Sequence, residues 1–313
     1  MQLYFFVFAL AFFLTLLLTP PIIRLAFKIG AVDVPDKRKV HDKIMPRLGG
    51  LAIFLSFCAA VVFLLFYYEY NLQVVGLLVG GAFILLVGIV DDIYSLPPLV
   101  KLLGQIIAAL VVVAFGIRVH FLSNPFDGYF QLGLMSIPVT ILWIVGVTNS
   151  INLIDGLDGL ASGVSFIALI TLTVIAVQIH QSTLIPLLSL SLAGAILGFL
   201  RYNFHPAKIF LGDSGSMLLG FTIAVLSTMG LLKSVTVYTF LIPIIILGVP
   251  IFDTSFAIVR RYSNNKPIFK PDKAHLHHRL LKRGLSHRQA VLAIYCLAIA
   301  FSLSAVYLVN RFN

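Results

Sequence analysis

A polar stretch between two long apolar segments carries the residues best suited to chemistry. Residues 149–163 read Asn-Ser-Ile-Asn-Leu-Ile-Asp-Gly-Leu-Asp-Gly-Leu-Ala-Ser-Gly, which places Asn149, Asn152, Asp155 and Asp158 at intervals of three. Residues i and i+3 lie on one face of a helix, so we expect the two amides and two carboxylates to converge. Beside lipid, such groups need a cation, a polar ligand or water. The alternative is a polar loop in which Asn and Asp only cap helices.

Two other segments add carboxylates. Asp91 and Asp92 end an apolar run, and adjacent carboxylates repel each other unless a cation compensates. They therefore indicate a divalent metal or a proton transfer, with simple exposure to water as the alternative. Asp213 follows Gly212 at the start of another apolar run, where free backbone N–H groups favour anions. Its carboxylate could hold a cation against those anions, or it could serve only as a helix N-cap.

A basic segment near the C-terminus contains three histidines, His275, His277 and His278. Their spacing resembles a zinc site, but no cysteine lies nearby, and the basic surroundings suit contacts with phosphate better. Asp253, in the apolar run before this segment, either supports the site or pairs with a nearby arginine. Pro243 and Pro250 in the same run predict a kinked or broken helix.

The composition shows which elements must position these residues. The chain has 313 residues, of which 60% are hydrophobic and 11% are charged, and its mean hydropathy is +1.04. Because a soluble core cannot use so much apolar sequence, we predict an all-α polytopic membrane protein with one integral membrane domain over residues 1–313. About ten transmembrane helices are expected, at residues 3–27, 48–68, 73–90, 99–116, 137–151, 159–179, 184–200, 214–232, 236–258 and 289–309.

The distribution of charge predicts the orientation in the membrane. If residues 28–47 are cytoplasmic, 18 of the 22 Lys and Arg residues and ten of the 12 acidic residues fall on that side. Lys and Arg concentrate in cytoplasmic loops, so we expect a multi-pass protein of the cell membrane with both termini outward and its active site on the cytoplasmic face. A basic face suits phosphate-bearing partners and anionic membrane lipid. Turn signals within 117–137 predict a small outward hairpin between helices four and five.

Four motifs, taken in order, resemble those of the polyprenyl-phosphate N-acetylhexosamine-1-phosphate transferases. This family includes the muramoyl-pentapeptide translocase of peptidoglycan synthesis and the GlcNAc-1-phosphate transferases of teichoic acid, O-antigen and N-glycan pathways. The motifs are Asp91-Asp92, residues 149–159, residues 203–213 and residues 275–278. Four ordered matches on one predicted face of the membrane are far more specific than any one of them.

The resemblance implies a ten-helix fold with outward termini and transfer of a sugar 1-phosphate from a UDP-sugar to undecaprenyl phosphate, with release of UMP. It implies a Mg²⁺ ion, with Mn²⁺ as the alternative, bound by Asp213 and Asn152. It also implies catalytic roles for a second group of residues, namely Asp91 and Asp92 at the lipid phosphate, Asp155, Asp158 and His275. A third group would bind substrate, namely Lys101, Asn203, Phe210, His277, His278 and Arg279. Within this group, Phe210 would stack on uracil and Asn203 would belong to the nucleotide site.

Elementary chemistry agrees with these roles. Phosphoryl transfer needs alignment and charge neutralisation, which a metal ion, Lys101 and His275 would supply. A polyprenyl phosphate is largely ionised near pH 7, so we favour its direct attack on the β-phosphorus, with Asp91 or Asp92 removing a residual proton or holding the acceptor. The alternative is a covalent aspartyl-phosphate intermediate.

The last motif predicts the donor sugar. The muramoyl-pentapeptide enzymes have three consecutive histidines there, whereas this chain has His275-Leu276-His277-His278, which resembles the GlcNAc-1-phosphate branch. We therefore expect UDP-N-acetylglucosamine, with another UDP-N-acetylhexosamine or the UDP-muramoyl-pentapeptide as alternatives.

Two other classes of protein are less consistent with the sequence. A cation-coupled transporter would need carboxylates near the membrane midplane and related halves, and a scaffold without activity would not need the full set of carboxylates. Nucleic acid is not an expected partner. A homodimer is left open.

Overall fold

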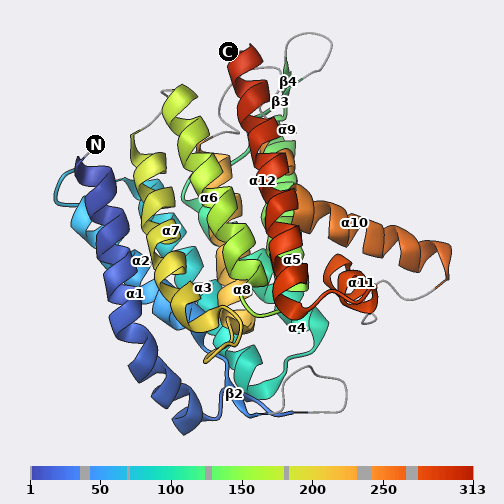
Figure 1. Ribbon diagram of the computed structural model, residues 1–313. Coiled ribbons are helices and arrows are strands. Elements are labelled where there is room, and N and C mark those ends of the chain that lie inside the picture. Colours follow the sequence, from blue (N-terminus) through green and yellow to red (C-terminus); the bar gives the residue numbers. More distant parts are fainter. Residues whose placement is uncertain are drawn as a thin grey trace.

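The computed structural model describes residues 2–35, 43–68, 71–123, 129–179, 183–230, 241–265 and 274–312. These residues form a helical bundle with two small two-stranded sheets (Figure 1). The helices are α1 (Gln2–Ile29), α2 (Gly49–Leu64), α3 (Leu72–Tyr94), α4 (Pro98–Ala114), α5 (Ser136–Ile154), α6 (Leu160–Ile179), α7 (Leu184–Asn203), α8 (Gly212–Gly230), α9 (Leu241–Ile246), α10 (Gly248–Ser263), α11 (Leu276–Lys282) and α12 (His287–Phe312), with a 3-10 turn at Gly133–Met135.

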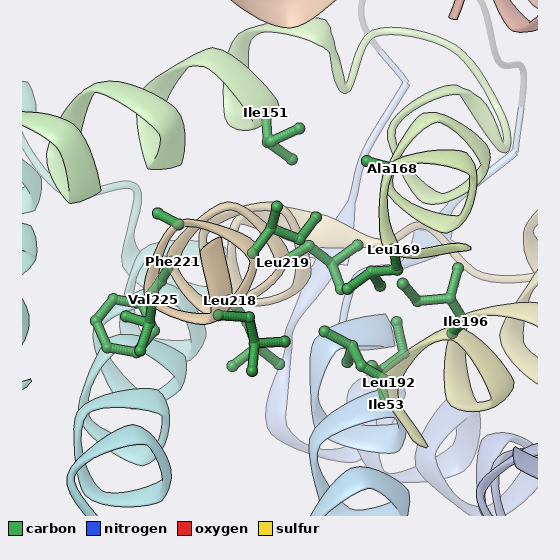
Figure 2. Close-up of a cluster of buried hydrophobic side chains, with 14 of the residues drawn as sticks. Ile53, Ile151, Ala168, Leu169, Leu192, Ile196, Leu218, Leu219, Phe221 and Val225 are labelled. Carbon is green, nitrogen blue, oxygen red and sulfur yellow. The ribbon is translucent and has the colours of Figure 1, made fainter. Parts of the chain in front are cut away.

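Helix α8 is the centre of the bundle. All of its residues are buried except Asp213, which is the second residue of the helix. Such a helix is apolar on all sides and needs neighbours all round. It packs against α2, α3, α5, α6 and α7, and Figure 2 shows this core, with side chains of α8 meeting Ile53 of α2, Ile151 of α5 and Leu169 of α6.

Glycines let the neighbouring helices approach the start of α8 closely. A Cβ added to Gly88 of α3 would lie 2.3 Å from the Cα of Ser214, and one added to Gly50 of α2 would lie 2.5 Å from the backbone nitrogen of Gly215. Small residues at such contacts allow helix backbones to pack tightly in a membrane. The ends of α2 and α3 are therefore held against the first turn of α8.

The helices correspond closely to the predicted spans. Among the described residues, six helices are long and apolar enough to cross a membrane by length and composition, and α2 and α4 are shorter apolar helices. These findings agree with a polytopic membrane protein. The run expected at 236–258 is divided in the structure, because α9 ends at Ile246 and α10 begins at Gly248. The break predicted from Pro243 and Pro250 is thus confirmed, and α10 projects away from the bundle in Figure 1.

Short strands join segments that are distant in the sequence. Strand β1 (Val32–Asp33) pairs antiparallel with β2 (Met45–Pro46), and the N–H of Phe210 donates to the carbonyl of Pro46 over 2.8 Å. This pairing holds the segment after α1 against the segment that enters α8. Between α4 and α5, β3 (Phe121–Ser123) pairs antiparallel with β4 (Tyr129–Gln131), where a hairpin was expected, and the turn residue Asp127 lies outside the described residues.

The predicted orientation can be tested with two exposed positions at opposite ends of the bundle. Figure 1 shows β3 and β4 close to the C-terminus, at one end of the bundle, and β2 at the other end. We expect a membrane-impermeant maleimide to label Phe130→Cys in intact cells and Lys208→Cys only after permeabilisation, because the basic loops face the cytoplasm. Cys58 and Cys296 are first replaced by serine. Labelling of both positions from the same side would contradict this orientation.

Candidate active site

Asp213 lies where polar side chains of several elements meet. The amide nitrogen of Asn152, on α5, donates to its Oδ1 and also to the Oγ of Ser216, at 2.8 Å in the second case. Two cations approach its Oδ2, the Nζ of Lys101 at 3.3 Å and a guanidinium nitrogen of Arg47 at 3.8 Å. The structure therefore brings together the two residues expected to bind metal.

Asp91 belongs to the same cluster. Its Oδ2 lies 2.6 Å from the Nζ of Lys101, and its Oδ1 accepts a hydrogen bond of 2.7 Å from the N–H of Leu96. The Nζ of Lys101 also lies 3.3 Å from the Oδ2 of Asp213, so Lys101 joins the two carboxyl groups. Two carboxyl groups this close repel each other when both are ionised, unless a cation lies between them.

Asp92 has a different environment from the one expected for a residue that contacts the lipid phosphate. Its side chain is 0% exposed. Its Oδ1 accepts from the N–H of Asp213 at 2.9 Å, and its Oδ2 accepts from the N–H of Ser214 at 3.1 Å. Asp92 thus satisfies the first turn of α8, so this capping role belongs to Asp92 and not to Asp213. Gly212 makes room for it, because an added Cβ would lie 2.5 Å from the Oδ2 of Asp92.

The polar stretch 149–163 does not form one helical face, contrary to our expectation. Helix α5 ends at Ile154 and α6 begins at Leu160, and Gly159 between them has a φ of +77°, which favours glycine. Only Asn149 and Asn152 are therefore on α5. Asn149 pairs with Gln105 of α4, its Nδ2 donating to the Oε1 over 2.6 Å.

Asp158 pairs with two histidines that sequence reasoning did not single out. Its Oδ2 lies 2.8 Å from the Nδ1 of His205 and accepts a hydrogen bond of 3.1 Å from the N–H of Ala207. Its own N–H donates to the Nε2 of His287 over 2.9 Å, and the two imidazole rings stack with centroids 4.2 Å apart. These contacts join the loop before α6, the loop before α8 and the start of α12. No local spacing in the sequence indicates the trio.

A cavity of about 580 Å³ opens beside this polar cluster. The volume is typical of sites for small molecules. Its wall brings together residues from five segments: Asp33, Lys43, Met45, Arg47, Asp155, Gly156, Leu157, Asp158, Asn203, His205, Pro206, Ala207, Phe210, Leu211, Gly212, His278 and His287. Burial, followed by the nearby charge of Asp213, raises the pKa of Asp155 to about 8. The Asp155 carboxyl group can therefore donate a hydrogen bond into the cavity at neutral pH.

Asn203 and Phe210 both line the cavity, and the structure gives them different neighbours. Asn203 is buried, its Oδ1 accepts from the hydroxyl of Ser162 at 2.9 Å, and its Nδ2 donates to the carbonyl of Ile209 at 3.0 Å. It therefore holds the loop before α8 in shape. Phe210 is half-buried at the end of that loop, where a flat ring can meet a ligand.

The histidine segment is anchored by Asp253, whose partner the sequence left open. The Oδ2 of Asp253 lies 2.8 Å from the Nδ1 of His275, and its Oδ1 accepts from the N–H of Leu276 at 2.8 Å. His275 is itself buried, at 5% exposure, whereas Arg279 is exposed. Asp253 thus supports the start of α11, which is the first of the two roles considered from the sequence.

His277 is buried against the turn that carries Asp155. A Cβ added to Gly156 would lie 2.3 Å from its Nε2. Burial, followed by the nearby His278 and His275, lowers the pKa of His277 to about 4, so its ring is neutral at pH 7 and contributes no positive charge to a phosphate. Within the described residues, the group of His and carboxylates that could share a metal ion is Asp158, His205 and His287, and not the three histidines near α11.

Comparison with known proteins identifies the family of the chain. The chain matches the model of glycosyl transferase family 4 over residues 74–231, a range that runs from the first turn of α3 to the end of α8. It is 53% identical over 294 residues to a probable undecaprenyl-phosphate N-acetylglucosaminyl 1-phosphate transferase of Bacillus subtilis, which covers 94% of this chain and 81% of the relative.

Two more distant relatives carry related names. A decaprenyl-phosphate N-acetylglucosaminephosphotransferase of Mycobacterium tuberculosis is 39% identical over 309 residues, with 90% of this chain and 76% of the relative covered. A phospho-N-acetylmuramoyl-pentapeptide-transferase of Halalkalibacterium halodurans is 32% identical over 321 residues, with 96% and 95% covered. With its polar cluster, its cavity and similarity along most of its length, the chain belongs to glycosyl transferase family 4.

Proposed function

We propose that this protein transfers N-acetylglucosamine 1-phosphate from UDP-N-acetylglucosamine to undecaprenyl phosphate at the cytoplasmic face of the membrane, with release of UMP. The observation that carries the proposal is the cluster of Asp91, Lys101, Asn152 and Asp213 at the start of the buried helix α8, beside a cavity of about 580 Å³. The product would start a polymer of the cell envelope. A chain that is 53% identical is named for this reaction.

The donor set of the cluster suits a hard divalent cation. Asp213 and Asp91 offer carboxylate oxygens, and the side-chain amide of Asn152, whose oxygen and nitrogen can exchange places by rotation, offers a third oxygen. Mg²⁺ prefers such oxygen ligands and is held by one or two carboxylates together with substrate phosphates. We propose that Asp213 and Asn152 hold Mg²⁺, with Mn²⁺ as the alternative. When bound, the ion would neutralise charge on the phosphates of the donor.

The cavity would hold the nucleotide of the donor. Phe210 at its wall offers a ring on which uracil can stack. Asp155 can donate a hydrogen bond from its protonated carboxyl group, and Asn203 shapes the wall by holding the loop behind it. His278 lines the cavity and Arg279 is exposed on the same helix, so we assign both, with His275, to the sugar and phosphate end of the donor.

The acceptor phosphate would approach from the side of Asp91 and Lys101. Lys101 offers a positive charge there, and Asp91 orients it over 2.6 Å. An oxygen of the lipid phosphate attacks the β-phosphorus of the donor, the bond from that phosphorus to the bridging oxygen breaks, and the bridging oxygen leaves with UMP. Both oxygens of Asp92 accept backbone N–H groups, so Asp92 is poorly placed to act as a nucleophile or a base. We assign the acceptance of a residual proton to Asp91, because it pairs with Lys101 where the lipid phosphate would approach.

The choice of donor can be tested directly on purified protein. We expect UMP release with UDP-N-acetylglucosamine and undecaprenyl phosphate, and a rate lower by about 10⁴-fold with UDP-glucose, because a site built to bind the acetamide leaves its partners unpaired. UDP-muramoyl-pentapeptide should be an equally poor donor. Measurement of UMP release with each of the three donors shows which one the protein uses. If the muramoyl donor were used as well as UDP-N-acetylglucosamine, the assigned branch would be wrong, although the reaction class would stand.

The role of Asp213 can be tested by Asp213→Asn. We expect UMP release to fall by about 100-fold or more, since a direct metal ligand loses its charge, and extra Mg²⁺ should restore little. The matched control is Asp253→Asn, which disturbs His275 and the start of α11 but lies outside the metal cluster. Its loss should be smaller. Substantial activity in Asp213→Asn would show that the carboxylate is not a metal ligand.

Because Asp92 caps α8, its substitution is expected to act differently from that of Asp213. Asp92→Asn keeps one acceptor oxygen and loses the charge, so a buried N–H of α8 loses its partner at a cost of about 1–3 kcal/mol. We expect a lower unfolding temperature together with partial activity and a higher Mg²⁺ requirement, because Asp213 is positioned less well. An unchanged unfolding temperature with complete loss of UMP release would instead identify Asp92 as a catalytic residue.

A further inference from the structure

Arg47 stands between the cavity and the carboxylate cluster, and neither our sequence analysis nor the family motifs assigned it a role. We propose that its guanidinium group binds the diphosphate of the UDP-sugar. The inference rests on the proposed function, which places this donor in the cavity. Arg47 lines that cavity and is also within 3.8 Å of Asp213, so it spans the place where a nucleotide and a metal cluster would meet.

The ion pairs of Arg47 leave its N–H groups able to turn toward a ligand. Its nitrogens lie 3.5 Å from the Oδ1 of Asp92, 3.7 Å from Asp33 and 3.8 Å from Asp213. A charge-assisted N–H···O bond is about 2.7–2.9 Å long, so none of these three contacts reaches that distance. The side chain keeps 27% of its surface exposed. By comparison, Lys101 is held at 2.6 Å by Asp91.

The backbone holds Arg47 firmly at this place. Its N–H donates to the carbonyl of Ala31 over 2.9 Å, and it forms a parallel bridge with Phe210. The neighbouring Pro46 accepts the N–H of Phe210. Arg47 is thus fixed to the same short ribbon as the aromatic side chain proposed to stack on uracil, which sets the distance between the site for the base and the site for the phosphates.

Charge explains why an arginine is needed here. A diphosphate that approaches the carboxylates of Asp91 and Asp213 meets repulsion unless cations face it. Within the described residues, the Lys and Arg side chains of the cavity wall are Lys43 and Arg47, and Arg47 is the one with an ion pair to Asp213. A guanidinium is always charged and offers a planar fork of donors that fits two phosphate oxygens at once, whereas lysine offers only a compact point charge.

Binding of uridine and of UDP can distinguish a phosphate-binding role of Arg47 from a purely structural one. Uridine has the base and ribose of the donor, and UDP adds the two phosphates. We expect Arg47→Gln to weaken UDP binding by about 10- to 100-fold and to change uridine binding by less than about 2-fold. Affinities are measured by titration of the purified full-length protein in detergent with Mg²⁺ present. Arg201→Gln, an exposed arginine at the end of α7, is the matched control and should bind both ligands like the wild type.

A second substitution covers the case in which Arg47→Gln does not fold. Arg47→Lys keeps the charge that faces Asp92 and loses the planar fork, so it should remain folded and weaken UDP binding by a smaller factor, again with uridine unaffected. An equal loss for UDP and uridine in either variant, or unchanged UDP binding in both, would overturn the inference. UMP release by the wild-type protein tests the proposed function separately, since UDP binding does not depend on the identity of the sugar.

Discussion

The start of helix α8 must satisfy its backbone N–H groups without help from water, and the rest of the site depends on how it does so. The helix is buried along its length, and an unpaired buried N–H costs about 1–3 kcal/mol. A buried carboxylate from α3 meets this need, since Asp92 accepts from the N–H groups of Asp213 and Ser214. Small residues permit it, because Gly88 and Gly212 leave the space in which α3 and α8 meet. One pair of hydrogen bonds thereby fixes the position of Asp213.

This arrangement has an electrostatic consequence that suits phosphoryl transfer. Asp92 brings a negative charge to a largely buried place, and the carboxylates of Asp91 and Asp213 lie close to it. Charges interact more strongly in such surroundings than in water, so the cluster requires compensating cations, and Lys101 and Arg47 already face it. Under the proposed function, a metal ion and the phosphates that accompany it would enter a site whose charges are already in place. Little reorganisation is then needed when charge moves during transfer.

The histidine segment is held in place from two sides. Asp253 holds His275 and the N–H of Leu276, and His277 packs against Gly156. The path of the backbone at the start of α11 is therefore set by contacts on both sides. Under the proposed function, this segment, of which His278 lines the cavity, would set the choice of donor. This is consistent with 53% identity to a relative named for an N-acetylglucosaminyl substrate and 32% identity to one named for a muramoyl-pentapeptide.

The sequence alone determined the membrane class, most helix positions and the group of polar residues, because apolar runs and charged interruptions are local properties of the chain. It also indicated the break in the run with Pro243 and Pro250. It could not predict that the residues of 149–163 would diverge, since the helix ends at Ile154 and the turn at Gly159 sends Asp158 toward His205. Nor could it separate Asp91 from Asp92, two adjacent carboxylates with different neighbours. Only the tertiary structure decided that Asp92 caps α8, that Asp253 anchors His275 and that Arg47 faces the cavity, because each of these contacts joins elements that are far apart in the sequence.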